Sequence, residues 1–127
     1  AGTTVMRILV VDDEVDVRDL FSQRFRREVK RGELIIDFAH SGEDAMKLLV
    51  KAEGPDYVLI LSDINMPGMS GLELLKEIKA RDVDQDVLMV TAYGDANNYK
   101  KAVEFGANGF LTKPVDFSEL RKQIFKS

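Results

Sequence analysis

Four short apolar segments of this chain end on polar side chains whose types could do chemistry together. These side chains are Asp12 and Asp13, Asp63, Thr91 and Lys113. A carboxylate can act as a nucleophile toward a phosphoryl group, and a hydroxyl and an ammonium can hold the oxygens of that group. Further carboxylates can bind the metal ion that such a transfer needs. The set therefore meets the requirements for phosphoryl transfer to an aspartate.

Asp63 has the most informative surroundings. Residues 57–62 before it are mostly apolar, which is typical of a strand buried on both faces. Residues 64–71 after it include a proline and two glycines, and Ser70 with Glu73 has the spacing of a helix capping box. These features predict Asp63 at the carboxyl end of a buried strand, where ligands bind in open α/β sheets. The competing interpretation is a loop acid that only caps a turn.

Asp12 and Asp13 follow another apolar run and are candidate metal ligands. If the strands are parallel, these acids lie close to Asp63, and crowding raises the pKa of some of them unless a cation is present. Oxygen ligands without histidine or cysteine indicate Mg²⁺. The alternative is that the acid pair caps the first helix, where the helix dipole favours anions.

Lys113 and Thr91 would complete the site. Lys113 precedes a proline at a strand end, where its ammonium can reach Asp63 as a compact point charge. Thr91 ends the preceding apolar run. Taken singly, Lys113 could form a plain salt bridge and Thr91 could be an ordinary strand former.

The elements that position these residues alternate regularly between strand and helix patterns. Strands are predicted at 7–11, 34–39, 57–63, 87–91 and 109–112. Helices are predicted from Glu14 to Gly32, from Ser41 to Gly54-Pro55, from Ser70 onward, from Gly94-Asp95 to Gly106, and from Asp116 onward. This alternation predicts a single (βα)5 doubly wound domain with a parallel five-stranded sheet in the flavodoxin-like order 2-1-3-4-5.

Hydrophobic spacing also predicts which helix residues point inward. In the first helix these are Val17, Leu20, Phe21, Phe25 and Val29. In the fourth helix they are Ala102, Val103 and Phe105. Asp37 within the second strand suggests an edge position for that strand.

Composition limits the possible functions of the chain. The 127 residues are 45% hydrophobic and 31% charged, which is ordinary for a globular domain. The net charge of -4 with scattered basic residues argues against direct nucleic-acid binding. The chain has no cysteine and a single histidine, which exclude thiolate sites and histidine clusters. With no membrane span and no secretory signal visible, the expected compartment is the cytoplasm.

Four motifs together resemble the receiver domain of bacterial two-component response regulators, which are CheY-like proteins. They are Val10-Val11-Asp12-Asp13-Glu14, the stretch from Asp63 to Gly71, Val90-Thr91-Ala92 and Leu111-Thr112-Lys113-Pro114. The resemblance covers residues 6–127, and residues 1–5 are set apart as a natural or added tail.

The resemblance implies a role for each site residue. Asp63 would be the phosphoacceptor, receiving its phosphoryl group from a phosphohistidine on a sensor histidine kinase or phosphotransfer protein. Asp13 and Asp63 would bind Mg²⁺ directly, Asn65 through its backbone carbonyl, and Asp12 mostly through water. Thr91 and Lys113 would bind oxygens of the phosphoryl group, and the Lys113-Pro114 peptide would be cis.

The resemblance also implies a switch and an output surface. Thr91 moving toward the phosphoryl group would let Phe110 turn inward; family members often have tyrosine there. Tyr93 would face the mouth of the site and could lengthen the phosphoryl lifetime, or could simply lie on the surface. The surface of the fourth helix, fifth strand and fifth helix, residues 95–125, would bind an output partner or domain or form a homodimer. Whether the chain stands alone or belongs to a longer protein is left open.

Three alternatives remain beside this hypothesis. A small Mg²⁺-dependent phosphatase of the haloacid dehalogenase type would need an acid two residues after its nucleophile, where this chain has Asn65. A flavin-binding module would need a phosphate loop after the first strand, where the acids of residues 12–14 would repel the phosphate. A receiver-fold scaffold that works without phosphorylation is the third.

In the favoured interpretation the chain is a signalling phosphoacceptor and catalyses only its own phosphorylation and slow dephosphorylation.

Overall fold

The five strands form one parallel sheet. The computed structural model describes residues 5–51, 56–91 and 95–125. The strands are β1 (Met6–Val11), β2 (Leu34–Ala39), β3 (Leu59–Asp63), β4 (Val87–Thr91) and β5 (Gly109–Thr112). Their order in the sheet is β2-β1-β3-β4-β5, and every neighbouring pair is parallel. This confirms the predicted flavodoxin-like fold class and the predicted edge position of β2.

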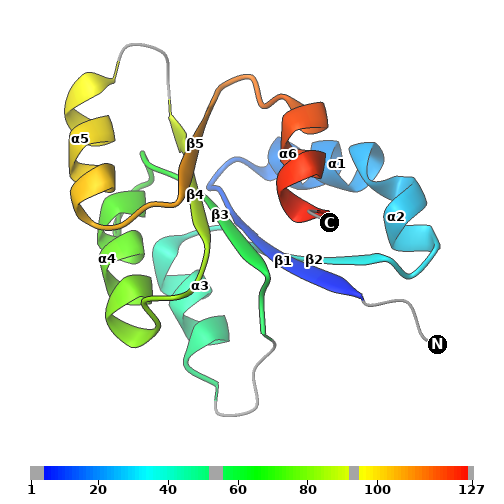
Figure 1. The fold of residues 1–127 in the computed structure, drawn as a ribbon, viewed down its shortest axis with the longest axis horizontal. Coiled ribbons are helices and arrows are strands. Elements are labelled where there is room, and N and C mark those ends of the chain that lie inside the picture. Colours follow the sequence, from blue (N-terminus) through cyan, green and yellow to red (C-terminus); the bar gives the residue numbers. More distant parts are fainter. Residues whose placement is uncertain (1–4, 52–55, 92–94, 126–127) are drawn as a thin grey trace.

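Helices cover both faces of the sheet (Figure 1). They are α1 (Val15–Arg24), α2 (Arg26–Lys30), α3 (Gly42–Leu49), α4 (Gly71–Arg81), α5 (Ala96–Glu104) and α6 (Phe117–Ile124). The helices α3, α4 and α5 lie on one face, and α1, α2 and α6 lie on the other. The domain is therefore doubly wound, with each face of the sheet sealed by its own helices.

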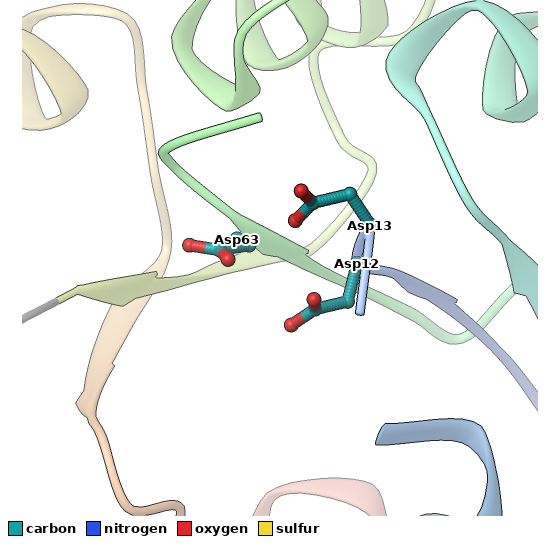
Figure 2. Close-up of side chains that lie close together, drawn as sticks. All are labelled: Asp12, Asp13 and Asp63. Carbon is teal, nitrogen blue, oxygen red and sulfur yellow. The ribbon is translucent and has the colours of Figure 1, made fainter. Parts of the chain in front are cut away.

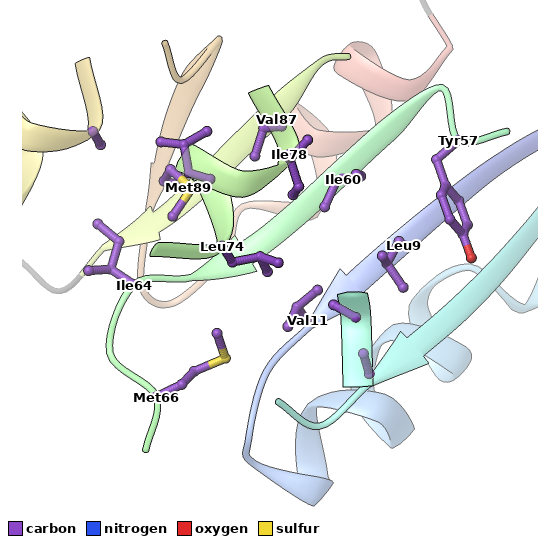
Figure 3. Packing of buried hydrophobic residues seen from close by; sticks show 14 residues of the cluster. Leu9, Val11, Tyr57, Ile60, Ile64, Met66, Leu74, Ile78, Val87 and Met89 are labelled. Carbon is purple, nitrogen blue, oxygen red and sulfur yellow. The ribbon is translucent and has the colours of Figure 1, made fainter. Parts of the chain in front are cut away.

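The central strands are apolar throughout because both of their faces are covered. Every residue of β3 and of β4 is buried. Successive side chains point to opposite faces, so Ile60 packs under α3 and α4, whereas Leu61 packs under α1 and α6. Figure 3 shows the first of these two cores, with Leu74 and Ile78 of α4 directed at the strands.

The prediction of one helix from Glu14 to Gly32 is wrong, because the structure has two helices there, α1 and α2. The break is at Phe25, whose backbone angles are φ -106° and ψ 18°. The break has no proline or glycine, so intrinsic propensity does not explain it. The Phe25 ring is fully buried and packs against the rings of Phe21 and Phe117, so tertiary packing fixes the chain here.

Three residues that were predicted to point inward are exposed instead. Leu20 is 41% exposed and Val29 is 45% exposed, although both fit the helical spacing. Val103 of α5 is also exposed, at 52%, whereas its neighbour Ala102 is buried. Adjacent helix residues point about 100° apart, so a helix lying on a sheet buries one and exposes the other.

The predicted helix starts are correct where the structure describes them. Ser41 accepts a hydrogen bond from the Asp44 amide, and Ser70 accepts one from the Glu73 amide. Asp116 accepts two amide bonds at the start of α6. The predicted end of the second helix at Gly54-Pro55 and the glycine at position 94 lie outside the described residues.

Candidate functional site

The parallel register brings the polar ends of four strands to one edge of the sheet. Asp63 is the last residue of β3 and Thr91 the last of β4. Asp12 follows β1 and continues its ladder through an amide bond to the Ala39 carbonyl. Lys113 follows β5 in the same way, its amide donating to the Thr91 carbonyl at 3.0 Å. The structure therefore places the predicted residues Asp12, Asp63, Thr91 and Lys113 along the same edge.

Three carboxylates form an acidic cluster at this edge. Asp12, Asp13 and Asp63 each offer one oxygen, and these oxygens all lie within 4.8 Å of one another. Figure 2 shows the three side chains reaching into the same space from the ends of β1 and β3. Asp12 and Asp63 are buried, at 8% and 6% exposure, whereas Asp13 is exposed. Two buried like charges are expensive without a cation nearby.

Lys113 supplies a cation to the cluster. Its Nζ donates to Asp63 Oδ2 at 2.8 Å and lies 3.8 Å from Asp12 Oδ2 and 3.9 Å from Glu14 Oε1. Partial burial alone would lower the pKa of Lys113, but the hydrogen bond to Asp63 and the charges of the three acids outweigh it, so the pKa is raised. Lys113 therefore stays protonated and is held over Asp63.

Asp12 has a pKa raised above its usual range, as the crowding predicted, but crowding is not the main cause. Burial is the largest effect. The Glu14 amide, which donates to Asp12 Oδ1 at 2.9 Å, lowers the pKa, and the Asp63 charge raises it. The surroundings of Asp12 therefore disfavour its negative charge, and a bound cation would favour it.

The alternative that Asp12 and Asp13 cap the first helix is not supported by the geometry. The capping position of α1 is Glu14, and no side chain makes a capping bond there. Asp12 instead accepts the Glu14 amide from just outside the helix. Its second oxygen, Oδ2, faces Lys113.

The loop after Asp63 holds the acid in place through the backbone. The Asn65 amide donates to Asp63 Oδ1 at 3.3 Å, and the Gly71 amide donates to the Ile64 carbonyl at 2.8 Å. A Cβ at Gly71 would collide with the carbonyl of Asp63. Glycine is therefore required there so that α4 can begin directly against the end of β3.

Glu43 makes a contact that could not be predicted from the sequence. Its Oε1 accepts the Met69 amide at 3.2 Å, which ties the loop after Asp63 to the start of α3. The two residues are 26 positions apart, and nothing in either segment indicates the pairing. Gly68 has φ +75° beside the same carboxylate, a conformation that favours glycine.

Thr91 and Phe110 lie on the neighbouring strands β4 and β5. Thr91 is buried, at 6% exposure, and Phe110 is partly buried against the core under α3, α4 and α5. Phe110 pairs in register with Met89, two residues before Thr91. The Lys113-Pro114 peptide is cis, as the resemblance implied. Tyr93 lies outside the described residues.

The acidic cluster suits a hard divalent cation. Its donors are carboxylate oxygens, to which Mg²⁺ binds through a small number of ligands while keeping waters. The residues present therefore fit Mg²⁺ by their chemistry.

The fold and the site define an α/β domain whose acidic centre lies at the carboxyl edge of a doubly wound parallel sheet. Residues 8–125 match the sequence profile of the family described as the response regulator receiver domain. The chain belongs to this family.

Curated relatives cover the chain almost completely. It is 36% identical over 120 residues to sporulation initiation phosphotransferase F of Bacillus subtilis, covering 94% of this chain and 91% of that protein. It is 36% identical to chemotaxis protein CheY of Halobacterium salinarum, covering 85% and 84%. Other relatives are much longer: this chain spans 30% of a cyclic di-GMP phosphodiesterase of Thermotoga maritima and 25% of response regulator protein PilR of Pseudomonas aeruginosa.

Solved structures show the same fold. A CheY-like receiver domain from Methanospirillum hungatei superimposes with a TM-score of 0.82 at 27% identity, covering 95% of this chain and 91% of that one. Response regulator protein TrrA from Thermotoga maritima, solved in complex with Mg²⁺-BeF, has a TM-score of 0.74 at 34% identity, covering 94% and 96%.

No helix within residues 5–51, 56–91 and 95–125 is both long and apolar enough to cross a membrane.

Proposed function

We propose that this receiver domain accepts a phosphoryl group on Asp63 from a phosphohistidine of a sensor histidine kinase or phosphotransfer protein. The observation that carries the proposal is the state of Asp63: a buried carboxylate at a strand end, bonded to Lys113 at 2.8 Å and crowded by two more acids. A carboxylate kept only for structure would not need further acids beside it. The arrangement supports a nucleophile beside a metal site.

In the transfer step a carboxylate oxygen of Asp63 attacks the phosphorus in line with the phosphorus–nitrogen bond of the donor. The new phosphorus–oxygen bond forms as the phosphorus–nitrogen bond breaks, and the electron pair of that bond leaves with the histidine nitrogen. The product is an acyl phosphate on Asp63. Because the chemistry needs little covalent help, positioning and charge stabilisation account for most of the catalysis.

Asp12, Asp13 and Asp63 would hold Mg²⁺, with the Asn65 backbone carbonyl as a further ligand. When bound, the ion would neutralise charge on the phosphoryl oxygens. The neighbour TrrA, described in complex with Mg²⁺-BeF, supports this assignment by analogy. Lys113 would pair with a phosphoryl oxygen, and the Thr91 hydroxyl would donate to another.

Asn65 argues against a fast phosphatase. It stands two residues after Asp63 and can neither donate nor accept a proton usefully at neutral pH. With no acid or base at this position, attack of water on the acyl phosphate has little help. We therefore expect a phosphoacceptor that turns itself over slowly, not an enzyme acting on free substrates.

The output would be a shift of Thr91 toward the phosphoryl group and of Phe110 toward the space that Thr91 leaves. The surface formed by α5, β5 and α6 lies next to Phe110, and we propose it as the site of an output partner, an attached domain or a homodimer. A cytoplasmic location and no direct contact with nucleic acid or membrane complete the proposal.

The proposal is tested by incubating the protein with acetyl phosphate and Mg²⁺ and measuring intact mass. We expect the gain of one phosphoryl group in the wild type and in Asp84→Ala, which removes an exposed acid between α4 and β4. We expect no gain in Asp63→Ala. The absence of any gain in the wild type would favour the scaffold that works without phosphorylation.

A further inference from the structure

The aromatic ring of Phe110 is stacked against a second ring from a different element. Tyr99 of α5 and Phe110 of β5 have ring centroids 4.2 Å apart and ring planes inclined by 35°. Tyr99 is 49% exposed, whereas Phe110 is partly buried against the core under α3, α4 and α5. Phe110 thus has the core on its inner side and Tyr99 against its ring.

The pair lies on the same face of the sheet as Thr91. Successive strand residues alternate between faces; Val87 and Met89 of β4 pack under α3, α4 and α5, so Thr91 faces that way too. Phe110 is the register partner of Met89, and Thr112 is the partner of Thr91. A displacement of Thr91 is therefore made next to Phe110 and on its side of the sheet.

We propose that Tyr99 is a positioning residue that holds the Phe110 ring in its partly buried orientation and so sets how readily the ring turns inward. A stacked aromatic pair is more stable than apolar contact of the same area. Turning the Phe110 ring toward the core breaks or rearranges this stack, so the stack opposes the switch. The inward turn of Phe110 on phosphorylation rests on the proposed phosphoacceptor function, whereas the contact between Tyr99 and Phe110 does not depend on it.

Within the part of the chain that the structure describes, Tyr99 is the aromatic partner of Phe110. The other aromatic pairs there belong to the opposite core, around Phe21 and Phe117. Tyr99 is also anchored in α5, where its amide donates to the Asp95 carbonyl at the first turn. Because Tyr99 is fixed at the start of α5, its ring can limit the rotation of the Phe110 ring on β5.

Three variants separate the aromatic contact from general packing. Tyr99→Leu removes the ring and keeps an apolar side chain, and Tyr99→Phe keeps the ring. Val103→Ala, on the same helix and 52% exposed, is the matched control. The readout is the NMR signal of ring-labelled Phe110, assigned with Phe110→Leu, recorded without ligand and then with Mg²⁺ and beryllium fluoride as a phosphoryl mimic.

We expect the ligand-free Phe110 ring signal to move in Tyr99→Leu, because the ring current of Tyr99 is lost, and to stay in place in Val103→Ala. With Mg²⁺ and beryllium fluoride, the equilibrium in Tyr99→Leu should move toward the inward ring by about two- to tenfold relative to wild type. Tyr99→Phe keeps the ring and should leave the equilibrium as in wild type, so a change seen in Tyr99→Leu is assigned to the loss of the ring.

An equilibrium that is the same in Tyr99→Leu and in wild type, or that moves toward the outward ring, would overturn the inference while leaving the proposed function intact. A wild-type Phe110 signal that does not respond to beryllium fluoride at all would contradict the proposed switch and the positioning role together. The two failures are therefore distinguishable in one series of spectra.

Discussion

Lys113 is the one ammonium that the described acids Asp12, Glu14 and Asp63 share, and its nearest carboxylate is the proposed nucleophile. A single cation beside four acids, counting Asp13, leaves the site with excess negative charge. Functional sites often carry such a destabilising arrangement of charges, and binding of a cation stabilises it.

This excess charge predicts the effect of Asp13→Asn on stability. Two carboxylates about 4 Å apart repel by on the order of 1 kcal/mol in water-like surroundings, and the change removes one charge while keeping the side chain's size. We expect the melting temperature without divalent cations to rise, and the further rise caused by Mg²⁺ to shrink. Asp84→Asn, which changes an exposed loop acid, is the control in the same thermal scans. A Mg²⁺ response equal to that of wild type would contradict a metal site at Asp13.

Thr91 is predicted to be insufficient for complete switching. Its hydrogen bond to a charged phosphoryl oxygen is worth about 1.5–3 kcal/mol, whereas moving a population from 1:99 to 99:1 needs roughly 5.5 kcal/mol. We expect the phosphorylated wild type to switch partially and Thr91→Ala to switch still less, as measured from NMR populations. Full conversion of phosphorylated Thr91→Ala would refute this role.

At the scale of elements, the strands and the site edge followed from sequence because their signals are local. Short apolar runs that end on acids, threonine or lysine mark strand ends, and parallel pairing then places those ends together. The break at Phe25 could not be foreseen, since its cause is burial against Phe21 and Phe117 rather than any residue that disfavours helix. The hydrogen bond from the Met69 amide to Glu43 was also missed, because its partners lie 26 positions apart and neither segment indicates the pairing.

The structure of the junction between β3 and α4 predicts the effect of a substitution at Gly71, which the sequence alone did not. The glycines after Asp63 were interpreted only as breakers of regular structure, but Gly71 has to be small because the Asp63 carbonyl lies where its Cβ would be. Overpacking usually costs about 1–3 kcal/mol, and more where backbone must move. We expect Gly71→Ala to lose at least that much in urea unfolding and to weaken Mg²⁺ binding, because the end of β3 shifts.

Gly32→Ala is a suitable comparison for Gly71→Ala. Gly32 has φ +74° and no atom within 4 Å of a built Cβ. Gly32→Ala should therefore lower the free energy of unfolding only by the strain of a left-handed residue, about 1–2 kcal/mol. Mg²⁺ binding should be unchanged. Equal effects of the two changes on Mg²⁺ binding would contradict the steric argument at Asp63.

For the whole molecule, a polar network away from the acidic cluster joins the first three strands. Arg7 of β1 donates to both carboxylate oxygens of Asp37 in β2, and the hydroxyl of Tyr57, just before β3, donates to Asp37 Oδ2 at 2.6 Å. Burial, together with the bond to Asp37, raises the pKa of Tyr57. This network gives the edge strand β2 an attachment beyond its backbone ladder.

Tyr57→Phe is expected to destabilise the fold by about 1.5–3 kcal/mol, the usual worth of a hydrogen bond to a charged group. Because the folded-state pKa of Tyr57 is raised, this contribution is fully present below the unfolded tyrosine value of about 10 and is lost as pH rises above it. The stability difference between wild type and variant in urea should therefore be constant from neutral pH and shrink at strongly alkaline pH. A difference that grows with alkaline pH would contradict this sign. Tyr99→Phe, which removes an exposed hydroxyl, should stay within about 0.5 kcal/mol of wild type.

If Asp63 alone carries the phosphoryl group, reductive trapping will locate the group at that residue and at no other. After incubation with acetyl phosphate and Mg²⁺, borohydride reduces an acyl phosphate on aspartate to the alcohol of homoserine, which peptide mapping locates. We expect homoserine at position 63 in the wild type, none at positions 12 or 13, and none anywhere without Mg²⁺. Homoserine at another aspartate, or labelling at position 63 that is independent of Mg²⁺, would contradict it.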